Sequence, residues 1–153
     1  MSIEIERKFL VVGDAWKTSA GEGLLCRQGY LAADKRKTVR VRILGDRGFL
    51  TIKGATDGIS RMEFEYEIDY PDAAYMLMLC DRIIEKHRYH LRHEGLIWEV
   101  DVFSGANEGL VMAEVELESE DQDVELPVWA GEEVSDDPRY YNACLAFHPF
   151  SGW

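Results

Sequence analysis

The chain has 153 residues, of which 46% are hydrophobic, and its 29 acidic and 17 basic residues give a net charge of −12. This length and composition predict one folded domain spanning 1–153 and exclude a disordered protein. The negative charge disfavours a protein that binds nucleic acid or an anionic membrane through general electrostatics, so we expect neither partner.

The three cysteines, Cys26, Cys80 and Cys144, are widely spaced and form no CxxC motif. Their odd number argues against a disulfide framework and indicates reduced thiols. Charged residues begin at Glu4, so no signal peptide is expected, and no apolar run approaches the roughly 20 residues of a membrane span. The expected location is therefore the cytoplasm.

Short segments in which polar and apolar residues alternate follow one another along the chain, and this alternation is typical of β-strands. The first is IEIERKFLV (3–11). Seven more strands are predicted at 24–31, 38–44, 49–54, 61–69, 83–92, 97–103 and 110–118. A helix is predicted over 71–82, where a proline precedes good helix formers, and a second over 139–147. Residues 119–138 are acidic and irregular.

Short turns join most of the predicted strands, which indicates antiparallel pairing. The fold class is therefore α+β with mainly antiparallel β-structure. Eight such strands can close into a barrel, and closure leaves no exposed sheet edge. The pattern alone also allows a β-sandwich.

The polar faces of the predicted strands carry almost only charged residues, and the two signs are partly segregated. Arg40 and Arg42 share one face of their strand, whereas Glu99 and Asp101 share a face of another. Other strands add the cations Lys53, Arg61, Lys86 and Arg88 and the carboxylates Glu63, Glu65, Glu114 and Glu116. These faces can lie in water, as one face of an antiparallel sheet often does, or they can line a shared interior.

An interior of this kind suits a polyphosphate chain and a divalent ion. Arginine makes bidentate contacts to oxyanions, and pairs of carboxylates bind Mg²⁺ or Mn²⁺, which also contact phosphate oxygens. Buried charges are costly unless they are paired or bound to a metal. A shared interior would provide that pairing.

The ordered motifs of the chain resemble the CYTH superfamily, whose members are also called triphosphate tunnel metalloenzymes. EIERKFLV contains the ExExK signature, and RQGYL, VRVR, TIKG, RMEFEYEI, EKHRY, WEVDVF and AEVEL follow in the family's order. The C-terminal GEEVSDDPRYYNACLA resembles the end of short bacterial members, although Tyr141 precedes Asn142 where those members often have Lys or Ser. The resemblance covers nearly the whole chain and implies a closed eight-stranded antiparallel barrel, the triphosphate tunnel, with a few flanking helices.

The resemblance also implies roles for individual residues. A divalent metal, Mg²⁺ or Mn²⁺, would be held by Glu4, Glu6 and Glu116, with Glu114 and Asp101 nearby. The triphosphate would be bound by Arg40, Arg42, Lys53, Lys86 and Arg88, with Arg61 as an addition. Glu63 and Glu65 would be further acidic residues of the tunnel.

Lys8 would lie at the reacting end of the tunnel and pair with Tyr30 of the QGYL stretch. We expect a lowered pKa for Lys8 among the other cations, which would let it help to activate water. A core position is the alternative for Tyr30, because Gly29 before it can mark a β-bulge.

The implied reaction is metal-dependent hydrolysis of a phosphoanhydride in inorganic triphosphate, a small-molecule substrate. The alternative within the superfamily is a class IV adenylate cyclase or a nucleoside or thiamine triphosphatase. A non-catalytic polyphosphate-binding module is a third interpretation, and the complete set of Glu4, Glu6, Glu116 and Lys8 argues against it. The resemblance leaves a homodimer open.

Overall fold

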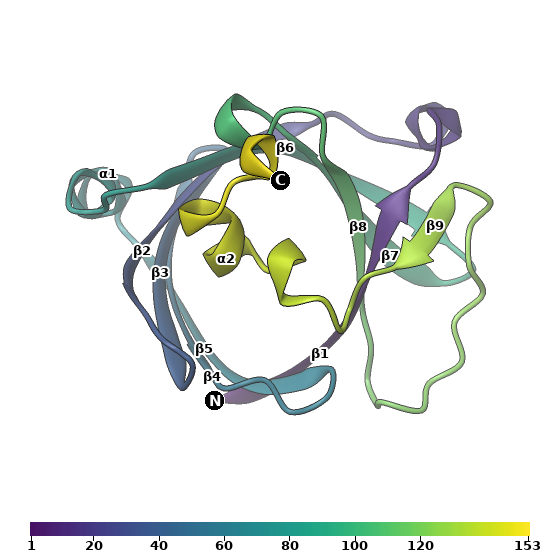
Figure 1. Cartoon of the computed structure of the whole chain (residues 1–153), viewed down its shortest axis with the longest axis horizontal. Helices are drawn as coiled ribbons and strands as arrows, with labels where there is room; N and C mark the ends of the chain where they lie inside the picture. Colours follow the sequence, from purple (N-terminus) through teal and green to yellow (C-terminus); the bar gives the residue numbers. More distant parts are fainter.

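The computed structural model describes all 153 residues, and its strands form one antiparallel sheet that closes on itself (Figure 1). Around the barrel the strands follow the order β5-β4-β3-β2-β6-β7-β8-β1, and pairing of β1 with β5 closes the ring. The bounds are β1 (Ser2–Val11), β2 (Leu24–Ala33), β3 (Lys37–Leu44), β4 (Arg47–Gly54), β5 (Ser60–Ile68), β6 (Ile83–His93), β7 (Leu96–Phe103) and β8 (Val111–Glu116). The predicted closed eight-stranded barrel is confirmed, and the sandwich is excluded.

Strand β1 is long enough to contact three neighbours. Residues 2–5 pair with β5, and residues 6–10 pair with β8 along the opposite edge. The short strand β9 (Ala130–Glu133) then pairs with the last part of β1. Because β9 lies within 119–138, the prediction of an irregular segment is wrong for these four residues.

The two helices occupy different places on the barrel. Helix α1 (Tyr70–Met78) packs on the outside of β3, where Ala73 and Leu77 contact Val41 and Ile43. It ends four residues earlier than predicted. The predicted C-terminal helix is divided into a 3-10 turn, η3 (Pro138–Tyr140), and α2 (Asn142–Phe147), because Tyr141 between them is extended.

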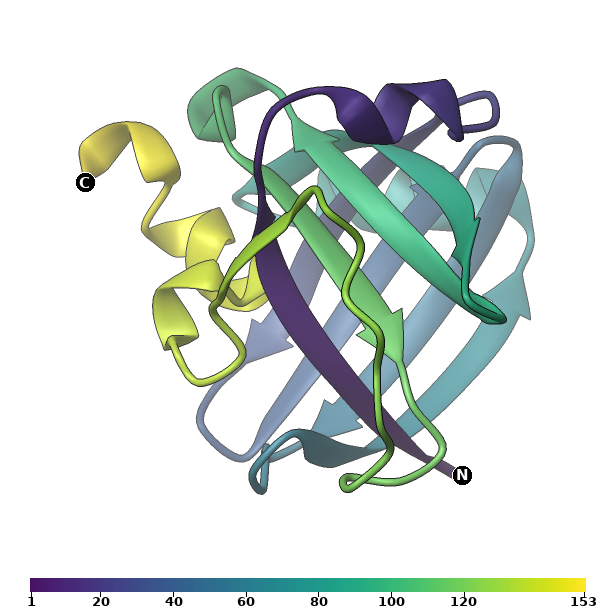
Figure 2. The same ribbon diagram turned by 90° about the vertical axis from the view of Figure 1, so that its right-hand side faces the viewer.

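The C-terminal segment lies across one end of the barrel, as Figure 1 and the rotated view in Figure 2 show. Here Leu145 of α2 packs against Ile84, Phe103 and Met112, which come from three barrel strands. Apolar side chains therefore close this end. Three more 3-10 turns lie between or after the strands: η1 (Ala15–Thr18), η2 (Gly105–Asn107) and η4 (Phe150–Gly152), the last of which belongs to the C-terminal segment.

The largest apolar core lies outside the barrel, on the outer face of β1, β7 and β8. Trp98 is fully buried there, with its ring centroid 5.5 Å from those of both Phe9 and Trp129. Trp16 of η1 belongs to the same cluster. None of the helices has the length and hydrophobicity needed to span a membrane.

Candidate active site

A cavity of about 1110 Å³ occupies the barrel, and charged side chains form most of its wall. Of the residues predicted from the sequence, those that line it are Glu4, Glu6, Lys8, Tyr30, Arg40, Arg42, Lys53, Arg61, Glu63, Glu65, Lys86, Arg88, Glu114 and Glu116. The alternating charged faces therefore point inward, and the interpretation that they lie in bulk water is wrong.

Two buried arginines of β3 form the centre of the cationic wall. The Nη2 atoms of Arg40 and Arg42 lie 3.8 and 3.5 Å from the same Glu65 carboxylate oxygen. The Nε atoms of both arginines are buried and have no acceptor within the protein. Burial, together with the charges of Arg40 and Arg88, lowers the pKa of Arg42. Positive charge is thus only partly compensated here, which is the property of an anion site.

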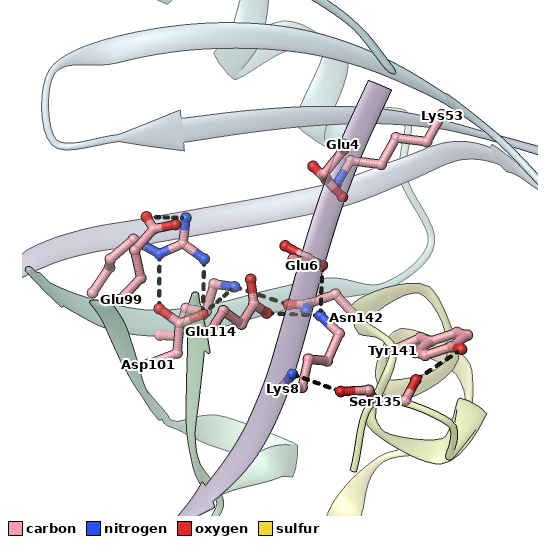
Figure 3. Close-up of polar contacts among 12 residues, drawn as sticks. Glu4, Glu6, Lys8, Lys53, Glu99, Asp101, Glu114, Ser135, Tyr141 and Asn142 are labelled. Carbon is pink, nitrogen blue, oxygen red and sulfur yellow. Dashed lines mark hydrogen bonds and ion pairs between the residues drawn. The ribbon is translucent and has the colours of Figure 1, made fainter. Parts of the chain in front are cut away.

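Asp101 lies behind the cavity wall, in contact with two of its cations. Its carboxylate oxygens are 2.8 Å from Arg88 Nε and 2.8 Å from Lys86 Nζ (Figure 3). Burial opposes ionisation of Asp101, but the charges of Arg88 and Lys86 outweigh it and lower its pKa to about 2. Asp101 does not line the cavity, because the side chains of Lys86 and Arg88 lie over its carboxylate. Its position near a metal stays a prediction.

Four glutamates from β1 and β8 form the acidic wall. Lys8 Nζ lies 3.0 Å from Glu6 and 2.8 Å from Glu114, and Lys53 Nζ lies 2.9 Å from Glu4. Glu116 makes no ion pair with these lysines. In the β1–β8 register it lies directly opposite Glu6, another carboxylate. Like charges directly opposite one another destabilise a sheet, so this arrangement calls for a cation.

The crowding of these acids raises several pKa values. Burial and the nearby Glu114 carboxylate raise the pKa of Glu6, and burial and the Glu4 charge raise that of Glu116. Burial and a hydrogen bond with Glu4 raise the pKa of Glu63 to about 7. A set of oxygen donors that repel one another fits a hard divalent ion. In this conformation no three acidic, histidine or cysteine side chains are grouped closely enough to hold a metal together, because lysines pair with Glu4, Glu6 and Glu114.

Comparison of the sequence and the structure with known proteins identifies the family of this chain. The CYTH domain model matches residues 2–141. The chain belongs to the CYTH family. It is 51% identical to an inorganic triphosphatase of Acetivibrio thermocellus, over all of this chain and 99% of that protein. An inorganic triphosphatase of Nitrosomonas europaea is 38% identical over 94% of this chain and 96% of its own length.

Among solved structures, the crystal structure of an inorganic triphosphatase with 38% identity superposes with a TM-score of 0.67 and covers 95% of both chains. The CYTH family consists of triphosphate tunnel metalloenzymes, so membership implies a divalent metal. The carboxylates that this CYTH barrel brings together are the donors such an ion prefers.

Lys8, the last residue of the CYTH signature, lies between two carboxylates, with its Nζ atom 3.0 Å from Glu6 and 2.8 Å from Glu114. Burial lowers its pKa, but the carboxylates of Glu114 and Glu6 outweigh burial and raise it. The expectation of a lowered pKa is wrong for this state, because β8 places Glu114 directly opposite Lys8.

Tyr30 lines the cavity, which answers the question of its orientation. Burial raises its pKa, so it remains a neutral hydroxyl at physiological pH. Gly29 itself keeps a regular pairing with Val41, and the register shifts only after Tyr30. A Cβ atom at Gly29 would lie 2.7 Å from Cys80, so the glycine permits close packing and does not mark a bulge.

Several residues of the site were not predicted. Glu99 lines the cavity and lies 2.9 Å from Arg88 Nη1, and its position two residues before Asp101 on the same face was the available signal. The C-terminal segment adds Ser135, whose Oγ accepts a 2.9 Å hydrogen bond from the Lys8 amide. Tyr141 donates to the Ser135 carbonyl at 3.2 Å, and Asn142 contacts Lys86 at 2.9 Å (Figure 3). No periodicity marks these residues.

Proposed function

We propose that this protein is a divalent-metal-dependent inorganic triphosphatase that hydrolyses a phosphoanhydride bond of triphosphate to give phosphate and pyrophosphate. The observation that carries the proposal is the juxtaposition of partly compensated buried arginines with crowded carboxylates in one cavity. The names of the two relatives, at 51% and 38% identity, support the choice of substrate.

The cationic wall binds the triphosphate. Arg40 and Arg42 provide guanidinium donors, and Lys53, Arg61, Lys86 and Arg88 add charges from neighbouring strands. Phosphoryl transfer depends mostly on positioning and on neutralising charge on the phosphoryl oxygens, and a fixed cationic cavity provides both. Asp101 acts behind this wall by holding Lys86 and Arg88 in place.

The acidic wall binds the metal, and Mg²⁺ or Mn²⁺ suits its all-oxygen donors. The donors would be Glu4, Glu6 and Glu116, with Glu114 next to them. When bound, such an ion neutralises phosphoryl oxygens and helps to orient the substrate. Glu63 and Glu65 extend the acidic surface on β5.

The cavity also holds a lysine, a tyrosine and a carboxyl group that can take part in hydrogen bonding. Lys8, whose ammonium group pairs with Glu6 and Glu114, and Tyr30 both line the cavity, where they can donate hydrogen bonds to phosphoryl oxygens. Glu63 also lines the cavity, and in the metal-free protein burial and the neighbouring Glu4 carboxyl group raise its pKa to about 7.

An assay of product distribution tests the proposal. The protein is incubated with Mg²⁺ or Mn²⁺ and tripolyphosphate, ATP or thiamine triphosphate, and phosphate, pyrophosphate and cyclic AMP are quantified. We expect equimolar phosphate and pyrophosphate from tripolyphosphate, at a higher kcat/KM than for either organic substrate. Pyrophosphate with cyclic AMP from ATP would identify a cyclase, and binding without turnover would identify a polyphosphate-binding module.

A further inference from the structure

The first residue of α2, Asn142, joins the C-terminal segment to the cationic wall of the cavity. Its Oδ1 atom lies 2.9 Å from Lys86 Nζ and 3.1 Å from Gln28 Nε2. Lys86 and Gln28 are almost fully buried, with 1% and 0% of their surfaces exposed, so these contacts are shielded from water. Asn142 also lines the cavity.

The chemistry of the partners fixes the orientation of the Asn142 amide. The ammonium group of Lys86 can only donate hydrogen bonds, so the atom facing it must be the carbonyl oxygen. Two donors occupy both lone pairs of Oδ1. The Nδ2 group, with two N–H donors, then lies on the other side of the amide, and the hydrogen bonds of Asn142 to other protein groups both go through Oδ1.

An asparagine in this position combines two properties that suit a bound polyanion. Through Oδ1 it holds Lys86, which Asp101 contacts from behind at 2.8 Å. Through Nδ2 it offers a neutral donor on the wall of the cavity that Arg40 and Arg42 also line. A neutral donor adds a contact to phosphate without adding another repelling charge to the wall.

We propose that Asn142 is a substrate-binding residue, in which Oδ1 holds the ammonium group of Lys86 while Nδ2 donates a hydrogen bond to a phosphate oxygen of inorganic triphosphate. This inference rests on the proposed function and assigns α2 a part in it. The C-terminal segment then completes the anion site, in addition to closing one end of the barrel.

Two substitutions separate the two halves of this role. Asn142→Ala removes both contacts, and we expect kcat/KM for tripolyphosphate to fall about tenfold to a hundredfold, mainly through KM, the range for a lost hydrogen bond to a charged group. Asn142→Asp keeps an acceptor for Lys86 but replaces the Nδ2 donor with a repelling oxygen, so we expect KM to rise at least as much as in the alanine variant. An aspartate variant with the KM of the wild type would overturn direct donation to substrate, and an unchanged alanine variant would overturn any role.

Asn107→Ala is a matched control for simple anchoring of the C-terminal segment. Asn107 Oδ1 accepts a 2.8 Å hydrogen bond from the Phe150 amide, so its loss loosens η4 without altering the cavity wall. We expect KM of this variant to stay within about twofold of the wild type. An increase matching that of Asn142→Ala would show that only the placement of the segment matters, and would overturn the proposal.

A titration of tripolyphosphate in EDTA, followed by calorimetry, keeps this test separate from the proposed activity. We expect the Asn142 variants to bind tripolyphosphate tenfold or more weakly than the wild type, whereas Asn107→Ala binds as the wild type does. If the wild-type protein binds tripolyphosphate but releases no phosphate with metal, the proposed function fails and the Asn142 contact is still tested. Equal binding by all variants would overturn the Asn142 proposal alone.

Discussion

The two faces of β1 differ in how they tolerate burial. Phe9 points outward and is 1% exposed, and its neighbour Lys8 points into the cavity and is 6% exposed. Phe9 packs against Trp98 in the outer core, where burial stabilises the fold by about 25 cal/mol per Å² of apolar surface. Lys8 is buried only because Glu6 and Glu114 pair with it.

This contrast shows how the barrel separates stability from function. The apolar clusters that stabilise it lie outside the wall and at the end closed by α2. The interior holds charges whose burial is costly and whose pairing is incomplete until an anion and a cation bind. Substitutions in the outer core and in the cavity should therefore affect different measurements.

Trp98→Ala should have the largest effect on stability. Trp98 is fully buried in the outer core, so its loss should lower the free energy of unfolding by about 3–5 kcal/mol. Denaturant unfolding measures this, and kcat/KM per folded molecule should change little. A large loss of kcat/KM with unchanged stability would contradict the separation of core and cavity.

Arg42→Met should lower activity and leave stability nearly unchanged. We expect kcat/KM for tripolyphosphate to fall about a hundredfold, equivalent to about 3 kcal/mol, because a charge-assisted phosphate contact is lost. The free energy of unfolding should stay within about 1 kcal/mol or rise, since Arg40 and Arg88 repel Arg42. Arg47 provides the control, because its guanidinium group lies over the Phe49 ring as that of Arg42 does, but it is exposed. Arg47→Met should preserve both kcat/KM and the free energy of unfolding.

Asp101→Asn should lower the free energy of unfolding at neutral pH by about 2 kcal/mol. This is the free energy that corresponds to lowering the pKa of the Asp101 carboxyl group from 3.8 to about 2 on folding. A carboxyl group whose pKa is lower in the folded state contributes stability above its unfolded pKa and loses it on acidification. The wild type should therefore lose this contribution between about pH 4 and pH 2, and the variant should not. Urea unfolding at a series of pH values checks this, and parallel curves for both proteins would contradict it.

Glu63→Gln should have the smallest effect on the free energy of unfolding. We expect a change on the order of 1 kcal/mol, because the carboxyl group is only half-buried. Its pKa is raised from 4.5 to about 7, so the folded state of the metal-free protein retains a proton that the unfolded state has released. Stability should thus fall as pH rises from about 4.5 to 7, and the glutamine variant should lack this part of the decline. Thermal unfolding in EDTA at pH 5 and pH 8 compares the wild type with the glutamine variant. An equal decline in stability for both proteins would show that Glu63 does not have a raised pKa.

The sequence predicted the barrel and its charged residues because each strand alternates with a period of two. That period places Glu4, Glu6 and Lys8 on one face, whichever way the face points. The inward direction depends on closure between β1 and β5, which are about 60 residues apart in the sequence, and no local pattern encodes it. The resemblance to a family provided that information.

The errors of prediction have the same origin. Strand β9 is stabilised by pairing with β1 and not by its own short sequence, AGEE. Alternation places Asp101 inward, but it cannot show that Lys86 and Arg88 cover it. Asn142 enters the site only because α2 packs on Ile84 and Phe103, a tertiary contact.

The most direct test of the central claim is a calorimetric titration of tripolyphosphate, without metal, into the wild type and an Arg40→Met, Arg42→Met double variant. The account predicts one tripolyphosphate bound per wild-type chain and at least a hundredfold weaker binding by the double variant, with Tm unchanged or higher. Equal affinity for the two proteins would show that the buried arginines serve some other purpose, and would contradict the assignment of the barrel interior as the substrate site.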